Sequence, residues 1–258
     1  MKFDHKKGQY ITSDDARLYV EEIGSADAPA LILLHGGFGD MESYNSIVPA
    51  LGKSFRLIGI DTRGHGASTL GKQPLTYALL ADDLAHIIQT LGFTKYSIMG
   101  FSDGGTTAYC YAAKQPQGLE KIITIGSGWE LNEGDPEWNM YSEISGKVWK
   151  RMFPESYDSY IALNPEADWD AFANNVIDMW KNLGAGNYPF EQVKNIAAEA
   201  LVIRGDKDPL TTLNSMARLM DRLQNAHYLN IPFAEHTAFD DQPDVFMNAV
   251  GQFLKVQI

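Results

Sequence analysis

A serine flanked by glycines is the first candidate for chemistry in this chain. Ser102 stands in G-F-S-D-G at residues 100–104, between a short apolar run that starts at Tyr96 and a segment with helical character. A serine on a sharp turn from strand to helix needs small neighbours, because the two elements approach closely there. Such a turn exposes the hydroxyl as a nucleophile and puts the amide N–H of Asp103 at a helix start, which favours negative charge. The same pattern also fits a simple capped turn, so the chemistry needs partners elsewhere.

A base and an acid are the partners that a serine nucleophile requires. The base removes the hydroxyl proton, and it works best when a third group fixes its tautomer. His236 follows the last predicted strand, and Asp208 follows the strand before it, so the order is serine, aspartate, histidine. Asp206 competes with Asp208 for the role of the acid. The other histidines are poor candidates for the base by position: His5, His35, His65, His86 and His227.

The elements that would position these residues alternate between strands and helices. The run at 30–34 is apolar without alternation, which is typical of a strand buried on both faces. The alternation of predicted strands and helices, with short connections between them, predicts an α/β fold with a doubly wound sheet. Further strands are predicted at 56–60, 121–126, 200–203 and 227–231, an antiparallel hairpin at 10–13 and 18–22, and helices at 41–51, 76–91, 211–223 and 243–254.

The segment 128–198 breaks this rhythm. It carries all five tryptophans and several helical pieces separated by prolines, and it has no buried strand. A structureless loop of about 70 residues is implausible in a compact domain, so we expect a helical cap inserted into a core of residues 1–127 and 199–258. We also expect at least one tryptophan to line a ligand pocket, with Trp129 as the candidate.

These motifs together resemble the α/β-hydrolase superfamily over nearly the whole chain. The resemblance rests on H-G-G-F at 35–38, D-T-R-G-H-G-A-S at 61–68, G-F-S-D-G-G at 100–105, G-D-K-D-P at 205–209, and His236. It implies a three-layer fold with a mostly parallel eight-stranded sheet and a helical cap after the sixth strand.

The resemblance also implies roles for particular residues. Ser102 would be the nucleophile, His236 the base and Asp208 the acid, because the family pattern G-x-x-D selects Asp208. The oxyanion hole would be formed by the backbone N–H of Gly37 or Phe38 together with that of Asp103. The reaction would require no cofactor and no metal. One such donor is typically worth ~2.7–4 kcal/mol of transition-state stabilisation. The chain departs from the family at Glu235, where glycine is usual before the histidine, and this puts the geometry of that loop in question.

The aspartate after the nucleophile suggests a substrate. G-F-S-D-G-G is similar to the G-W-S-D-G-G of the biphenyl hydrolase-like serine hydrolases, in which this aspartate is thought to hold an α-ammonium group. A carboxylate about 5 Å from an oxyanion opposes it by roughly 3 kcal/mol at an effective dielectric of 20, unless it points away or a cation neutralises it. An acidic residue in a first helical turn is an equally good explanation of Asp103. Phe101, just before the nucleophile, and Asp103 are therefore candidate substrate-binding residues along with Trp129.

Composition limits the partners. The 258 residues carry a net charge of −12, which argues against nucleic acid binding, and no apolar run is long enough for a membrane span. The N-terminus has no apolar region of a signal peptide, so we expect a cytoplasmic protein that acts on a small molecule as a monomer or small homo-oligomer. The single cysteine, Cys110, lies on an apolar stretch of the helix after Ser102 and is expected to be buried.

The expected function is hydrolysis of a small carboxylic ester through an acyl-enzyme, with an α-amino-acid ester as the first substrate to test. Carbon–carbon bond hydrolases, lactonases, perhydrolases and acyltransferases share the same three residues, so these activities remain alternatives. A non-catalytic binding protein with this fold is the alternative from a different class. A dinucleotide-binding protein would need G-x-G-x-x-G where this chain has H-G-G-F-G-D.

Overall fold

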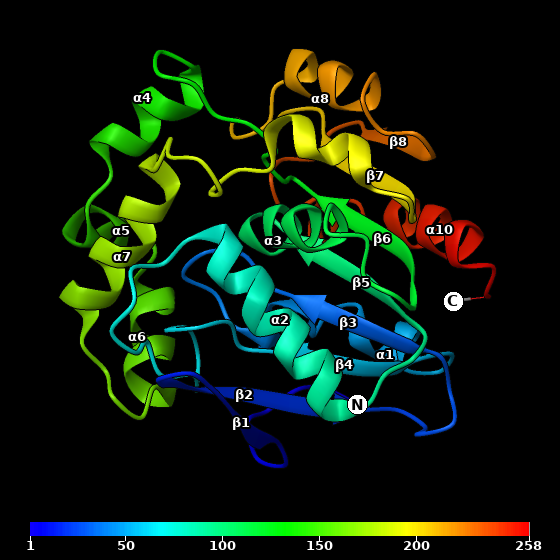
Figure 1. The fold of residues 1–258 in the computed structure, drawn as a ribbon, viewed down its shortest axis with the longest axis horizontal. Coiled ribbons are helices and arrows are strands. Elements are labelled where there is room, and N and C mark those ends of the chain that lie inside the picture. Colours follow the sequence, from blue (N-terminus) through cyan, green and yellow to red (C-terminus); the bar gives the residue numbers. More distant parts are fainter. Residues whose placement is uncertain (258) are drawn as a thin grey trace.

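A single eight-stranded sheet forms the middle layer of the molecule (Figure 1). The computed structural model describes residues 1–257. The strands lie in the order β1-β2-β4-β3-β5-β6-β7-β8, and β3 to β8 run parallel to one another. The antiparallel strand is β2, which pairs with β1 and β4. The bounds are β1 Gln9–Ser13, β2 Ala16–Ile23, β3 Ala30–Leu34, β4 Arg56–Ile60, β5 Tyr96–Phe101, β6 Leu119–Ile125, β7 Glu199–Gly205 and β8 Ala226–Ile231.

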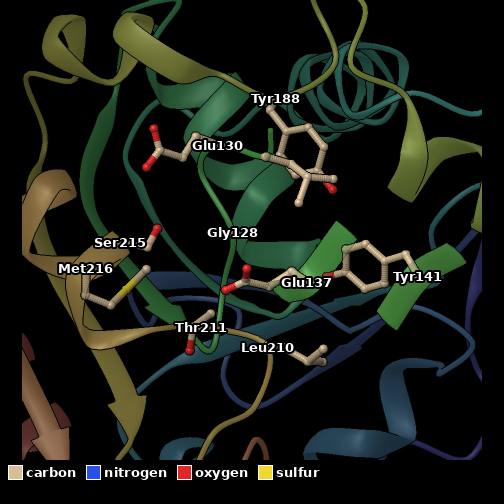
Figure 2. A pocket seen from close by; sticks show the side chains of 10 residues that line it. Gly128, Glu130, Glu137, Tyr141, Tyr188, Leu210, Thr211, Ser215 and Met216 are labelled. Atoms are coloured by element: carbon tan, nitrogen blue, oxygen red, sulfur yellow. The ribbon is translucent and has the colours of Figure 1, made fainter. Parts of the chain in front are cut away.

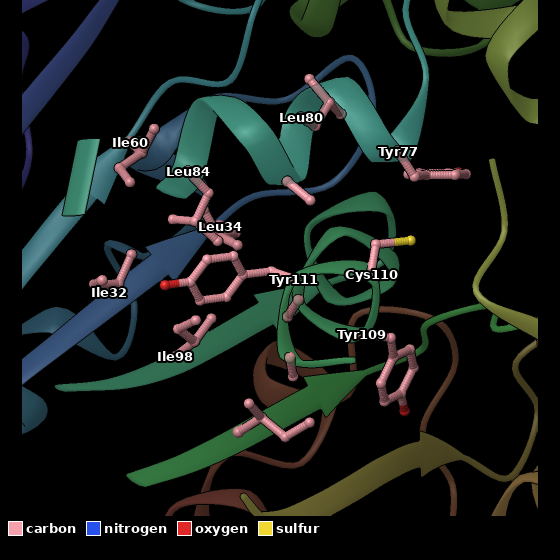
Figure 3. Packing of buried hydrophobic residues seen from close by; sticks show 14 of the residues in the cluster. Ile32, Leu34, Ile60, Tyr77, Leu80, Leu84, Ile98, Tyr109, Cys110 and Tyr111 are labelled. Carbon is pink, nitrogen blue, oxygen red and sulfur yellow. The ribbon is translucent and has the colours of Figure 1, made fainter. Parts of the chain in front are cut away.

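Helices cover both faces of the sheet because the central strands are apolar on both sides. Every residue of β3 is buried. Ile32 and Leu34 pack into one apolar cluster with α2 (Tyr77–Leu91) and α3 (Asp103–Ala112), part of which Figure 3 shows. Leu31 and Leu33 pack into the other cluster, with α1 (Val48–Leu51), α9 (Ala238–Asp241) and α10 (Pro243–Leu254). The fold is therefore the three-layer α/β arrangement that the sequence predicts.

Most predicted elements are present, but the helix expected at 41–51 is not continuous. The chain forms a 3₁₀ helix at Met41–Tyr44 and then the one-turn helix α1. Pro49 lies in the first turn of α1, which is where a residue without an N–H donor is tolerated, and it would break a longer helix. The helix expected at 211–223 is also shorter: α8 spans Leu213–Met220, with the Thr212 hydroxyl capping its N-terminus.

Four helices lie between β6 and β7 in sequence, and we refer to them as the cap helices. They are α4 (Pro136–Glu143), α5 (Gly146–Met152), α6 (Pro154–Leu163) and α7 (Trp169–Lys181), followed by a 3₁₀ helix at Phe190–Asn195. In Figure 1 they lie together at the left, on the side toward which β3 points. The buried side chains of α7 belong to the same apolar cluster as α2 and α3, so the division into a core and a separate 128–198 subdomain stays an interpretation.

The connection after α7 is tied to the core through buried Asn187. Its amide donates to the carbonyls of Met179 and Asn182, both at 2.8 Å, and its oxygen accepts from the N–H of Tyr77 at 3.0 Å. The thiol of Cys110 on α3 donates to the Asn187 carbonyl at 3.3 Å. Burial raises the pKa of Cys110 to about 12, as expected for a structural thiol.

None of the helices in residues 1–257 is long and apolar enough to cross a membrane.

Candidate active site

Ser102 occupies a strained turn between β5 and α3. Its φ of 52° and ψ of −119° lie outside the regions that side-chain-bearing residues favour, and such strain costs of order 1–3 kcal/mol. The glycines around it are needed for space. A Cβ on Gly104 would lie 2.0 Å from the Leu34 carbonyl oxygen, and one on Gly100 would lie 2.4 Å from the carbonyl oxygen of Gly104. The serine is therefore held at the point where β5, β3 and the start of α3 meet.

His236 and Asp208 are in direct contact. The Nδ1 atom of His236 lies 3.0 Å from each carboxylate oxygen of Asp208. The same carboxylate accepts from the Thr211 hydroxyl at 2.7 Å and from the Leu210 N–H at 2.8 Å. Burial disfavours ionisation of Asp208, but the hydrogen bond and charge of His236 outweigh it and lower the pKa of the carboxyl below its usual value. Because Nδ1–H donates to this carboxylate, Nε2 is left as a proton acceptor.

The strand ends bring this pair to the serine. Ser102, Asp208 and His236 follow the carboxyl ends of β5, β7 and β8, which lie at one edge of the parallel sheet. Gly126, at the end of β6, has a φ of 57°, and a Cβ there would lie 2.9 Å from Nδ1 of His236. The ring of Phe101 lies 4.9 Å from that of His236, centroid to centroid. No hydrogen bond joins Ser102 to His236 within residues 1–257, and bonds of this kind often form only when substrate is bound.

The loop after β3 lies beside the serine. A Cβ on Gly36 would approach that of Ser102 to 3.1 Å, and one on Gly37 would lie 2.4 Å from Oδ2 of Asp103. Phe38 has a φ of 59°, in the left-handed region that residues other than glycine rarely adopt. As the first residue of α3, Asp103 has one of the four N–H groups at the helix start that lack an intrahelical acceptor. This arrangement can offer backbone donors to negative charge that develops next to Ser102.

The Asp103 side chain is buried and accepts hydrogen bonds from one side chain of the core and one of the cap helices. Its Oδ1 accepts from the Tyr77 hydroxyl and its Oδ2 from the Trp180 indole N–H, both at 2.7 Å. Burial raises the pKa of Asp103, and the two donors offset this only in part. Neither donor carries a charge, and no lysine or arginine pairs with Asp103 in the described part of the chain. Two of the carboxylate's lone pairs are thus in use, and it retains the capacity to accept from a cation.

A small cavity adjoins the Asp208 loop (Figure 2). Its volume of about 20 Å³ suits roughly one water molecule. Thr211, which donates to Asp208, forms part of the cavity wall. Glu137 of α4 forms another part, and burial raises the pKa of its carboxyl. Two lining residues, Glu137 and Tyr141, lie on cap helix α4, and the others lie on α8 or in connecting segments: Gly128, Glu130, Leu131, Tyr188, Leu210, Thr211, Ser215 and Met216.

Trp129 is not among the residues that line this cavity. It is 1% exposed, and its indole N–H lies 3.1 Å from both the carbonyl and the hydroxyl oxygens of Ser215. The tryptophan that hydrogen-bonds to a candidate site residue in the described part of the chain is Trp180, on α7. The sequence around Trp180 does not indicate that it lies at the site, because its partner Asp103 is 77 residues away in the chain.

The competing acid and two of the competing histidines have other surroundings. Asp206 is exposed, whereas Asp208 is 4% exposed. His35 Nδ1 donates to the Gly36 carbonyl at 2.7 Å, and its Nε2 accepts from the N–H of Thr62 at 3.0 Å. Burial lowers the pKa of His65 to about 3, so this ring is neutral. The contacts of His35 give it a structural role, and the neutral ring of His65 is fully buried.

The remaining histidines lie away from the serine. His5 lies between Glu42 and Asp61, and although burial opposes its charge, the hydrogen bond that its Nε2–H donates to Asp61 raises its pKa to about 9. His86 reaches the carbonyl of Thr12, and exposed His227 lies 3.4 Å from Glu199. In the loop before His236, the N–H of Glu235 donates to the Asp241 carboxylate at 2.7 Å, so this departure from the family pattern is accommodated by an ordered turn.

Comparison with known proteins finds hydrolases among both the sequence relatives and the structural neighbours. Residues 29–167 match the family model described as alpha/beta hydrolase fold, and residues 168–256 match the model of TAP-like protein. The serine hydrolase BPHL of Homo sapiens is 28% identical over 257 residues, covering 95% of this chain and 85% of that protein. The 3-oxoadipate enol-lactonase 1 of Acinetobacter baylyi is 24% identical over 250 residues, covering 92% and 93%. The crystal structure of a hydrolase from Pseudomonas aeruginosa superposes with a TM-score of 0.80 at 21% identity, covering 97% and 99%.

Proposed function

The chain belongs to the alpha/beta hydrolase fold family and is a hydrolytic enzyme, and from this premise we propose that it cleaves small carboxylic esters with a Ser102–His236–Asp208 triad. The observation that carries the proposal is the contact of His236 Nδ1 with the buried Asp208 carboxylate, at the same sheet edge as the strained Ser102. A histidine held in this way has its basic nitrogen free for the serine proton.

The reaction would proceed in two steps. Ser102 Oγ attacks the ester carbonyl carbon while His236 Nε2 takes the hydroxyl proton, and the oxyanion accepts from the N–H of Asp103 and of Gly37 or Phe38. When the C–O bond breaks, His236 returns the proton to the leaving alcohol, and the acyl group remains on Ser102. Water then attacks the acyl-enzyme with His236 as its base, which releases the carboxylic acid and restores the serine.

Labelling with a fluorophosphonate probe tests the proposal. We expect one equivalent of probe on Ser102, loss of ester hydrolysis in step with labelling, and no labelling of Ser102→Ala. Cleavage of esters, lactones and carbon–carbon bond substrates by the native enzyme would then separate the activities that the same triad allows. A native protein that folds, is not labelled and hydrolyses none of these substrates would leave the non-catalytic binding protein as the better explanation.

An α-amino-acid ester is the more specific substrate class that we propose. The supporting observation is the buried Asp103 carboxylate, which accepts from two neutral donors and has no cationic side chain as a partner among residues 1–257. A substrate ammonium group would offset the cost of this buried charge next to the oxyanion. The resemblance to the biphenyl hydrolase-like enzymes points to the same class.

The test compares an α-amino ester with its des-amino analogue. The native enzyme should favour the amine in kcat/KM by about 10-fold or more, equivalent to roughly 1.4 kcal/mol, and Asp103→Asn should abolish this preference. Tyr77→Phe is the matched control, because it removes one hydrogen bond to Asp103 and keeps the charge. If the preference is absent in the native enzyme or survives in Asp103→Asn, the carboxylate serves to anchor Tyr77 and Trp180.

A further inference from the structure

Phe38, in the loop after β3, is enclosed by the cap helices. Its ring stacks on Trp149 of α5 at a centroid distance of 4.4 Å, and it meets three aromatic rings of α7: Trp169 at 5.5 Å, Phe172 at 5.3 Å and Trp180 at 5.5 Å. Phe38 is 4% exposed. A left-handed backbone is unfavourable for a residue with a Cβ, so contacts must hold Phe38 in its φ of 59°. These contacts come from the cap helices.

The carbonyl of Phe38 is held as well. The Ser156 hydroxyl, in the first turn of α6, donates to it at 2.7 Å, and the indole N–H of Trp149 donates to the Ser156 oxygen at 3.3 Å. Ring and carbonyl are thus fixed at once, by different helices. Because these two anchors hold the Phe38 Cα and the atoms bonded to it, the position of the Phe38 backbone N is restrained too.

A neighbouring serine provides a contrast. Ser159 lies on α6 three residues after Ser156, and its hydroxyl donates at 2.8 Å to the Asp40 carboxylate. The other oxygen of that carboxylate caps the 3₁₀ helix at Met41–Tyr44 by accepting from the N–H of Glu42 at 2.8 Å. Both serines therefore join α6 to the same loop, but only Ser156 bonds to the backbone of Phe38.

We propose that Ser156 is a positioning residue for the oxyanion hole and that Trp149 supports it. This inference rests on the proposed function, in which the N–H of Gly37 or Phe38 is an oxyanion donor. Donors contribute only when they lie about 2.7–3.1 Å from the developing oxyanion, and a misplacement of 1 Å can cost about 100-fold in rate. On this view, the hole is complete only while α5 and α6 are packed on Phe38.

The experiment measures ester hydrolysis by Ser156→Ala and by the matched control Ser159→Ala. We expect Ser156→Ala to lower kcat about 10- to 100-fold with KM changed less than about twofold, since the hole acts on the transition state. Binding of a trifluoromethyl ketone, which forms an oxyanion on Ser102, should weaken by the same factor. Ser159→Ala should keep kcat within about twofold of the native enzyme. Ser156→Thr retains a hydroxyl and should restore most of the activity.

A second variant keeps the inference testable if Ser156→Ala folds poorly. Trp149→Phe preserves an aromatic ring on Phe38 but removes the N–H that holds the Ser156 hydroxyl, so a smaller fall in kcat, about threefold, is expected. Equal losses in Ser156→Ala and Ser159→Ala, or a rise in KM with kcat unchanged, would overturn the positioning role. The proposed function would survive those outcomes, because the native enzyme would still hydrolyse the ester. A native enzyme that neither reacts with the phosphonate nor cleaves any ester would overturn both.

Discussion

Asp208 is held by more than its histidine. Thr211 and Leu210 donate to its two oxygens, so the carboxylate cannot turn away from His236, and its lowered pKa keeps it ionised at neutral pH. We expect Asp208→Asn to lower kcat for an ester about 10⁴-fold at pH 7, because an amide does not hold the tautomer in which Nε2 is basic. Asp206→Asn alters an exposed carboxylate two residues earlier and should leave kcat unchanged. Equal losses in the two variants would contradict the role of Asp208.

The junction of β5 and α3 depends on the absence of a side chain at Gly104. We expect Gly104→Ala to lower the free energy of unfolding by about 3 kcal/mol or more, because its Cβ would meet the rigid backbone of β3 at 2.0 Å. Gly92→Ala, at the end of α2, has a positive φ of 72° but open space, so its cost should be nearer 1 kcal/mol. Urea denaturation of both variants measures the difference. Similar midpoints and slopes for the two would mean that the junction can relax.

At the scale of the whole molecule, the cap helices close over the site through contacts between distant segments. The buried amide of Asn164, after α6, donates to the carbonyls of Gly64, Gly66 and Ser68 at 3.2, 3.0 and 2.8 Å. Trp180 adds the hydrogen bond to Asp103. The cavity beside Thr211 has room for about one water molecule, so an ester can occupy it only if the surrounding segments, which include α4 and α8, move apart.

The sequence predicted the parts of this molecule that local pattern specifies. Consecutive apolar residues at 30–34 mark a central strand, and the glycines around Ser102 mark a turn that needs close approach. The chain order after Ser102 predicted that Asp208 and His236 lie at neighbouring strand ends, where the structure has them in contact. Their catalytic roles stay a proposal.

The contacts of the cap helices could not be predicted in the same way. They join residues about 80 to 120 positions apart, as in Trp180 with Asp103 and Ser156 with Phe38, and no periodicity links such pairs. Trp129, the expected pocket residue, is instead buried against α8. The expected helix at 41–51 is interrupted because a proline outweighs apolar spacing.

The buried thiol of Cys110 can report on the opening of the segment that carries Asn187, which follows α7. It is the only thiol of the chain, the segment that carries Asn187 lies against it, and burial raises its pKa to about 12, which disfavours the reactive thiolate at pH 8. An alkylating reagent will therefore modify the native protein only in the fraction of time that this segment is detached from α3. The rate of modification, compared with that of the unfolded chain, gives the free energy of this detachment without an engineered label. The same measurement with substrate analogues present would show whether ligands hold this segment against α3.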